Sequence, residues 1–330
     1  LMTGKKVSEM SDAAGLLWLD VAKRDWSDKV LAATGLTREN MPVLIEGSES
    51  SGTLLPEIAE KWGLSAEVVV AGGGGDNAAS AVGVGAVNPG DAFISLGTSG
   101  VVFVVSEAYR PAPKDAVHCF CHALPERWHQ MSVMLSAAAC LSWYCKLIGV
   151  READLLVEIA GLSEEQKANA PIFLPYLSGE RTPHNDPFAS GIFHGIRHSS
   201  DRAVMGYAVI EGVGFGIADG VRVLQQSGTH IEQCSLLGGG ARSPFWAKLL
   251  ADTLQLPIVT HKGGETGGAL GAARLAALAA GADEKEVCTK PEIAQVFEPE
   301  AANADYLAKR YALFRALYQQ DKAFRQAQAV

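Results

Sequence analysis

Four consecutive glycines between an apolar segment and an alanine-rich segment constrain the fold of this chain more than any other feature. Residues 67–71 are predicted as a β-strand, residues 72–75 are the glycines, and residues 76–82 are predicted as a helix. Asp76 falls where a helix N-cap belongs. Its carboxylate either caps the helix or, at the mouth of an α/β site, accepts a proton from an incoming hydroxyl group. Both interpretations predict an α/β protein.

Two more glycine turns follow strands. Residues 97–100 join two β-rich runs, 92–96 and 101–105, and form a predicted hairpin whose tip offers free N–H groups and two hydroxyls. Such a tip either binds phosphate or is an ordinary tight turn. Residues 238–240 are glycines between a predicted strand and a predicted helix. Because they lack side chains, a flat ligand or a phosphate could lie directly against their backbone.

Composition narrows the class of protein. The chain has 330 residues, of which 48% are hydrophobic and 20% charged, so it is long enough for two domains and ordinary for a globular protein. A net charge of −9 disfavours nucleic acid as a partner, because duplex binding needs a clustered positive face. Neither a run of about 18 apolar residues nor an export signal is present in the sequence, so we expect a cytoplasmic protein without a membrane partner.

The six cysteines do not form a CxxC pair and are expected to be reduced thiols. Residues 118–122, with the sequence His-Cys-Phe-Cys-His, look like a metal cluster. On a strand, however, the histidines face one way and the cysteines the other, so four ligands would not converge. We therefore predict a buried strand here.

Four other helices are predicted. Residues 11–15 are interpreted as the cap of a helix over 16–21, and residues 136–148 as a helix with small residues in its first turn, which suit either ligand approach or close packing. Residues 201–226 are predicted as a helix whose five glycines indicate very close packing. Residues 301–330 are predicted as an amphipathic helix that docks back on the first segment. A domain boundary is expected near residue 66.

In their order and spacing the motifs resemble the FGGY family of carbohydrate kinases, within the actin-like ATPase superfamily. The resemblance covers essentially the whole chain, and it is greatest to the members that phosphorylate xylulose. It is carried by residues 11–15 (SDAAG), 73–79 (GGGDNAA), 95–100 (SLGTSG), 173–184 (FLPYLSGERTPH) and 238–242 (GGGAR).

This resemblance implies an α/β fold of the actin-like, ribonuclease H-like type. Residues 1–66 would be a remnant of the N-terminal sugar-kinase domain, 67–300 the C-terminal FGGY nucleotide-binding domain, and 301–330 a C-terminal helix packing on the N-terminal domain. The Asp-x-Gly-Thr-Ser phosphate loop and most of the N-terminal domain of the family are not found in the sequence, so the resemblance leaves open whether this chain alone is active.

The resemblance also implies residue roles. Asp76 would be the catalytic base. ATP would be bound by a group of small residues from three segments: Gly97, Thr98, Ala138, Ser142, Gly239, Gly240 and Ser243. Mg²⁺ would accompany ATP near Asp76.

The implied reaction is ATP-dependent phosphorylation of D-xylulose to its 5-phosphate, with the sugar and ATP as small-molecule partners. The resemblance is also compatible with a homodimer. One alternative is a kinase of L-ribulose, gluconate or glycerol. The other is an actin-like nucleotide-binding module without catalysis.

Overall fold

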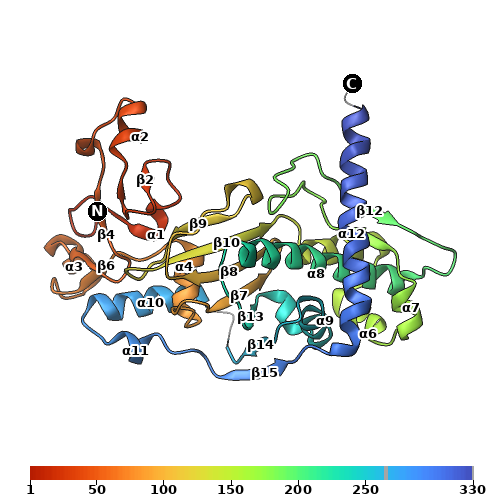
Figure 1. The fold of residues 1–330 in the computed structure, drawn as a ribbon. Coiled ribbons are helices and arrows are strands. Elements are labelled where there is room, and N and C mark those ends of the chain that lie inside the picture. Colours follow the sequence, from red (N-terminus) through yellow and green to blue (C-terminus); the bar gives the residue numbers. More distant parts are fainter. Residues whose placement is uncertain (264–266, 329–330) are drawn as a thin grey trace.

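A seven-stranded mixed sheet lies at the centre of the computed structural model, which describes residues 1–263 and 267–328 (Figure 1). The strand order is β15-β14-β13-β7-β8-β10-β9. β13 runs parallel to both of its neighbours, and the other neighbouring pairs are antiparallel. The strands are β7 (Ala92–Leu96), β8 (Gly100–Ser106), β9 (His118–Cys121), β10 (Trp128–Met134), β13 (Cys234–Leu237), β14 (Ile258–His261) and β15 (Ile293–Phe297).

The predicted hairpin is confirmed. β7 and β8 pair from Ala92↔Val104 to Leu96↔Gly100, so residues 97–99 form the tip. Alternate side chains go to opposite faces of the sheet, as the period of a strand requires. Phe93 and Phe103 stack on one face with ring centroids 4.7 Å apart.

Helices cover both faces of this sheet (Figure 1). On one face, α5 (Ala138–Ile148), α8 (Arg202–Gln226) and α9 (Pro244–Leu254) share a core with alternate residues of β7 and β8. On the other face, α4 (Asp76–Gly83) contributes to a second cluster with Phe93 and Phe103, and α10 (Gly267–Ala279) packs on α4. The smaller elements are α6 (Glu152–Ala160), α7 (Glu164–Ala168), β11 (Ile172–Leu174), β12 (Ile192–His194), α11 (Glu284–Val287), and the short 3-10 helices Arg38–Asn40, Pro113–Asp115 and Gly239–Arg242.

The glycines of α8 confirm the predicted close packing. A side chain at Gly220 would overlap Ser132 of β10, and one at Gly212 would overlap the backbone of Phe173 in β11. Within the described residues, α8 is also the helix that satisfies the length and hydropathy of a membrane span, but 94% of that window is buried inside the fold. It is therefore the core helix of this domain.

We expect Gly271→Ala to destabilise the fold. Gly271 of α10 lies against α4, and a Cβ there would overlap the carbonyl group of Ala79, which is backbone and does not yield easily. The free energy of unfolding should fall by about 1–3 kcal/mol or more in urea titrations.

Gly268→Ala on the same helix is the matched control. The nearest atom to its added Cβ would be the Ser80 Oγ, at 3.5 Å, which is an ordinary contact. Alanine also has the higher helix propensity. Equal losses of stability in the two variants would contradict the packing argument.

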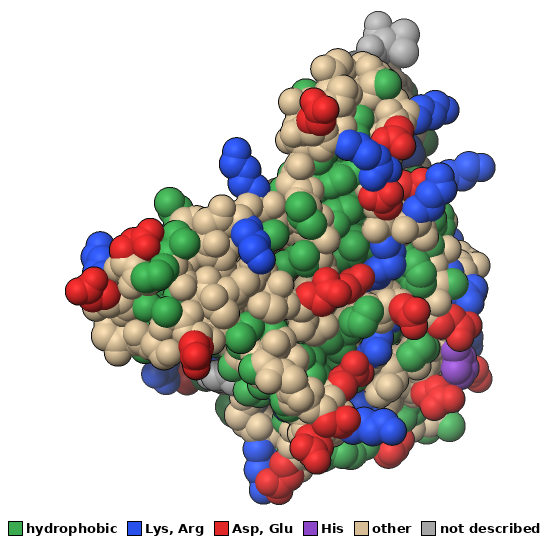
Figure 2. Space-filling model, turned by 90° about the vertical axis from the view of Figure 1, so that its left-hand side faces the viewer, with side chains coloured by type: hydrophobic (Ala, Val, Ile, Leu, Met, Phe, Trp, Pro, Cys, Tyr) green, Lys and Arg blue, Asp and Glu red, His purple; other side chains and the backbone are tan. Residues whose placement is uncertain are grey.

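Residues 1–66 form small sheets and short helices beside the main sheet. Their elements are β1 (Val7–Glu9), α1 (Met10–Ala13), β2 (Leu19–Asp20), β3 (Asp25–Trp26), α2 (Asp28–Ala33), β4 (Val43–Ile45), β5 (Ser50–Thr53) and α3 (Pro56–Trp62). β5 pairs with β6 (Val69–Ala71), which follows residue 66. On the face of the molecule that carries this segment, acidic and basic side chains are interspersed (Figure 2).

The helix predicted over residues 16–21 is wrong. The helix in this region is α1, which ends at Ala13, and Leu19–Asp20 pairs with Asp25–Trp26 as a two-residue hairpin strand. The cap is the side chain of Glu9, which precedes the motif on which the prediction was based.

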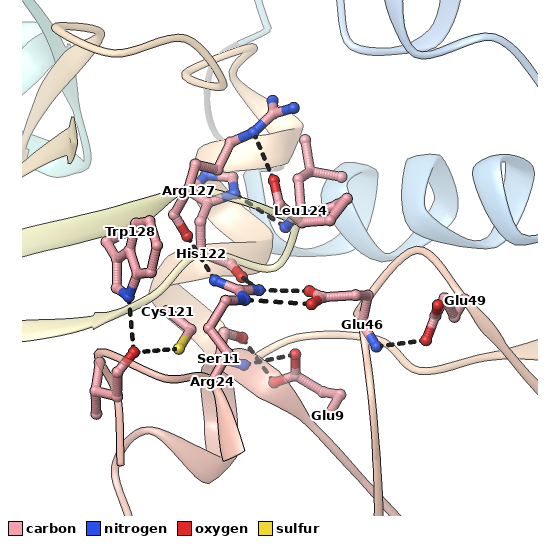
Figure 3. Close-up of polar contacts among 12 residues, drawn as sticks. Glu9, Ser11, Arg24, Glu46, Glu49, Cys121, His122, Leu124, Arg127 and Trp128 are labelled. Atoms are coloured by element: carbon pink, nitrogen blue, oxygen red, sulfur yellow. Dashed lines mark hydrogen bonds and ion pairs between the residues drawn. The ribbon is translucent and has the colours of Figure 1, made fainter. Parts of the chain in front are cut away.

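Arg24 and Trp128 join the first segment to the β9–β10 hairpin (Figure 3). The Arg24 guanidinium pairs with the Glu46 carboxylate at 2.5 Å and donates to the Arg127 carbonyl at 2.7 Å. The Trp128 indole N–H donates to the Val21 carbonyl at 2.8 Å. These contacts hold the segment against the edge of the main sheet.

The C-terminal helix α12 (Ala301–Gln328) packs elsewhere than expected. Its contacts are with α8, α9 and β11, not with the first segment. Phe314 and Tyr318 are buried there, and Arg310 pairs with Glu211 of α8. The docking is decided by this buried pair and by the aromatic face of the helix.

Candidate active site

Two of the three glycine turns lie side by side. β7 and β13 are parallel neighbours, with Leu237 opposite Ser95. The turns that follow them therefore lie next to each other at the carboxyl ends of these two strands. A side chain at Gly238 would lie 2.9 Å from the Leu96 carbonyl oxygen, and Gly238 has a φ of +84°. Only glycine combines that backbone conformation with so close an approach.

The third glycine turn approaches the protein's own backbone. Gly72 donates its N–H to Glu49 O at 2.8 Å, and Gly73 donates to Gly47 O at 3.1 Å. A Cβ at Gly72 would lie 2.5 Å from Glu46 O. The glycines thus allow residues 72–73 to pass close to residues 46–49 before α4 begins.

A polar hollow connects α4 to the other two turns. Its volume is about 320 Å³, and its lining includes Asn77 and Ser80 of α4, Ser95 at the end of β7, and Gly238 and Gly239. Small residues and hydroxyl groups at the start of a helix are suited to phosphate oxygens. The hollow is therefore the candidate place for the phosphates of a nucleotide.

A larger cavity of about 810 Å³ adjoins this hollow, because Gly239 and Arg242 line both. Five of the predicted ATP-binding residues line it together: Ala138, Ser142, Gly239, Gly240 and Ser243. The rest of its wall is largely apolar, with Leu141, Leu156, Val157, Phe245 and Trp246. An apolar cavity of this size with a few polar groups suits a nucleoside.

Gly97 and Thr98 hold the start of α5 beside the larger cavity through their backbone carbonyl groups. The Gly97 carbonyl accepts a hydrogen bond from the Ala138 N–H at 2.9 Å, and the Thr98 carbonyl accepts one from the Ala137 N–H at 2.9 Å. The Thr98 side chain is exposed at the hairpin tip. Backbone hydrogen bonds therefore link the hairpin tip to the first turn of α5 beside the cavity.

Asp76 is the first residue of α4, and its side chain is exposed. The N-cap itself is Gly75, one residue earlier than predicted. The Asp76 carboxylate accepts hydrogen bonds from the Asn77 N–H at 2.8 Å and from the Asn77 side-chain amide at 3.0 Å. Asn77 lines the polar hollow, whereas Asp76, the residue before it, is not among the lining residues.

Asp12 is a second exposed carboxylate beside this point, and the sequence prediction did not single it out. A Cβ built on Gly75 would lie 3.8 Å from the Asp12 Cα atom. The Gly75 N–H donates to Ser11 Oγ at 3.0 Å and to Glu9 Oε1 at 3.2 Å, so the starts of α1 and α4 touch. The only signal in the sequence was the SDAAG stretch itself, which contains Asp12.

Within the described residues, which include 118–122, groups of three or more histidine, cysteine, aspartate or glutamate side chains that could hold a metal ion are not found. Cys119 and Cys121 are buried in β9, as predicted. Burial lowers the pKa of His122 to about 3. This neutral ring contacts the Ala86 carbonyl and accepts the Leu124 N–H at 3.1 Å, which is a structural role.

The mixed sheet with helices on both faces has the actin-like ATPase fold, as the family resemblance implied, and the two adjoining cavities are its candidate nucleotide site. The chain belongs to the FGGY family of carbohydrate kinases. The C-terminal domain of that family matches residues 92–280, and its N-terminal domain matches residues 1–83.

Individual relatives are similar over almost the whole chain. The xylulose kinase of Escherichia coli (strain K12) is 51% identical over 97% of this chain, and that of Klebsiella pneumoniae is 48% identical over 96%. A solved structure described as a xyloylose kinase from Brucella ovis is 48% identical, with a TM-score of 0.94 over 98% of this chain. The chain spans 66%, 65% and 66% of the lengths of these three proteins, respectively.

Proposed function

We propose that the protein transfers the γ-phosphoryl group of ATP to the terminal hydroxyl of D-xylulose, giving D-xylulose 5-phosphate and ADP. The observation that carries the proposal is the cavity lined jointly by residues from α5, from the turn 239–240 and from the start of α9. The similarity to xylulose kinases supports the choice of sugar.

In this reaction the sugar oxygen forms a bond to phosphorus while the bond to the ADP oxygen breaks, and a carboxylate takes the hydroxyl proton. We propose that the base belongs to the neighbouring pair Asp12 and Asp76, with Asp76 as the residue that the sequence predicts. The exposed Asp76 carboxylate and the Asn77 amide also offer the oxygen ligands that Mg²⁺ prefers. Mg²⁺ bound with ATP would neutralise phosphate charge.

Gly239→Val tests the nucleotide site. Gly239 lines both cavities, and nothing lies within 4 Å of a Cβ placed there. A valine side chain should therefore occupy the ligand's space without clashing with the protein. We expect ATP to bind about 10- to 100-fold more weakly in titration calorimetry, with an unchanged Tm. Gly239→Ala should show a smaller effect, and unchanged ATP affinity in Gly239→Val would contradict the site.

A substrate panel tests the reaction. The protein as its gene encodes it should consume ATP with D-xylulose faster than with L-ribulose, gluconate or glycerol. A nucleotide-binding module without catalysis would bind ATP but show no dependence on any sugar. We place the reaction in the cytoplasm, in keeping with six free, buried cysteines, and a homodimer stays a prediction.

A further inference from the structure

Glu9 is a buried carboxylate at the end of β1 that accepts hydrogen bonds from four donors. Figure 3 shows its contact with Ser11. Its oxygens accept the Ser11 N–H at 2.9 Å, the Ser11 hydroxyl at 2.6 Å, the Gly75 N–H at 3.2 Å and, at shorter range, the Asp12 N–H. With 7% of the residue exposed, Glu9 has little surface with which to meet a ligand. Its contacts in the structure are therefore hydrogen bonds to the backbone and to the Ser11 hydroxyl.

The groups that it holds are far apart in the sequence. Ser11 and Asp12 begin α1, whereas Gly75 is the N-cap of α4, 66 residues after Glu9. The Gly75 N–H is shared between Glu9 and the Ser11 hydroxyl, at 3.2 and 3.0 Å. The carboxylate thus fixes the backbone beside Asp12 and directly before Asp76.

We propose that Glu9 is a positioning residue, which sets the spacing between the Asp12 and Asp76 carboxylates at the site of phosphoryl transfer. This inference rests on the proposed function. Transfer depends mainly on placing the acceptor, the base and the phosphate, and a displacement of about 1 Å costs on the order of 10²-fold in rate. Hydrogen bonds to a charged acceptor are stronger than neutral ones, so a buried carboxylate is suited to holding backbone in place.

A purely structural role for Glu9 is the alternative, because a cap on α1 also stabilises the fold. The two roles differ in what they change. Loss of a cap lowers stability, whereas loss of positioning lowers kcat at unchanged ATP affinity. Glu46 provides the matched control, since it is another partly buried acid of the first segment and pairs with Arg24 at 2.5 Å.

The experiment compares the Glu9→Gln and Glu46→Gln variants of the full-length gene product. We expect Glu9→Gln to lower kcat by about 10²-fold, to change the KM for ATP less than about twofold, and to speed amide exchange at Gly75 and Asp12. Glu46→Gln should keep its kcat, even if its Tm falls. Unchanged kcat in Glu9→Gln, or equal losses in both variants, would overturn the proposal.

Two further measurements keep the proposal testable. If Glu9→Gln does not fold, Ser11→Ala removes one of the two acceptors of the Gly75 N–H and should lower kcat in the same direction. If the unaltered protein phosphorylates none of the sugars, the proposed function has failed, yet amide exchange still tests the link. Unchanged amide exchange at Gly75 in Glu9→Gln and in Ser11→Ala would then overturn the role of Glu9.

Discussion

Asp76→Asn is expected to lower kcat for D-xylulose phosphorylation by about 10²- to 10⁴-fold while ATP still binds, if Asp76 is the base. The substitution keeps the size of the side chain and the hydrogen bonds from Asn77 but removes the proton acceptor. Initial rates with D-xylulose and the Kd of ATP measured separately check this expectation.

Asp12→Asn is the companion variant, because Asp12 is exposed and lies beside Gly75. Loss of activity in Asp12→Asn with activity retained in Asp76→Asn would move the base to Asp12 and contradict the sequence assignment. A variant that loses affinity for Mg²⁺·ATP and recovers at high Mg²⁺ has lost a metal contact and not a base. Near-normal turnover in both variants would refute a base in this pair.

Arg310→Met is expected to lower the free energy of unfolding by about 3–5 kcal/mol, since it leaves the Glu211 carboxylate buried without its partner. Arg310 Nε lies 2.6 Å from Glu211 Oε1, and the guanidinium also donates to the carbonyls of Ala170 and Pro171 at 3.0 and 3.2 Å. Urea titration followed by circular dichroism measures the change.

Two controls identify the cause. Arg202→Met removes an exposed pair with Glu158 and should change stability little. The double variant Arg310→Met, Glu211→Leu should recover part of the loss, because it removes the orphaned charge as well. A loss as large in Arg202→Met as in Arg310→Met would show that burial of the pair is not the reason.

Patterns of neighbouring residues predicted much of the fold. The β7–β8 hairpin, the strand before residue 238 and the close packing of α8 follow from β-branched runs, glycine turns and helical glycines, which act over a few residues. The family resemblance implied that Ala138, Ser142, Gly239, Gly240 and Ser243 form one group, and the cavity lining brings these five residues together.

Long-range contacts explain the errors. The helix expected over residues 16–21 is replaced by α1, because the buried Glu9 carboxylate caps that earlier turn and is itself held by Gly75. The last helix was expected on the first segment, but Arg310 finds its partner in α8. Neither partner is adjacent in sequence, so no local pattern reveals it.

By itself, the sequence determined the β7–β8 hairpin, the strand before residue 238, the glycine turns and the family, since each depends on residues that are close together in the chain. Tertiary structure decided which carboxylate lies beside Asp76, what the glycines at 72 and 73 approach, and where α12 docks. The physical reason is that these contacts join residues between 23 and 99 positions apart in the sequence, and their geometry exists only after the segments have packed.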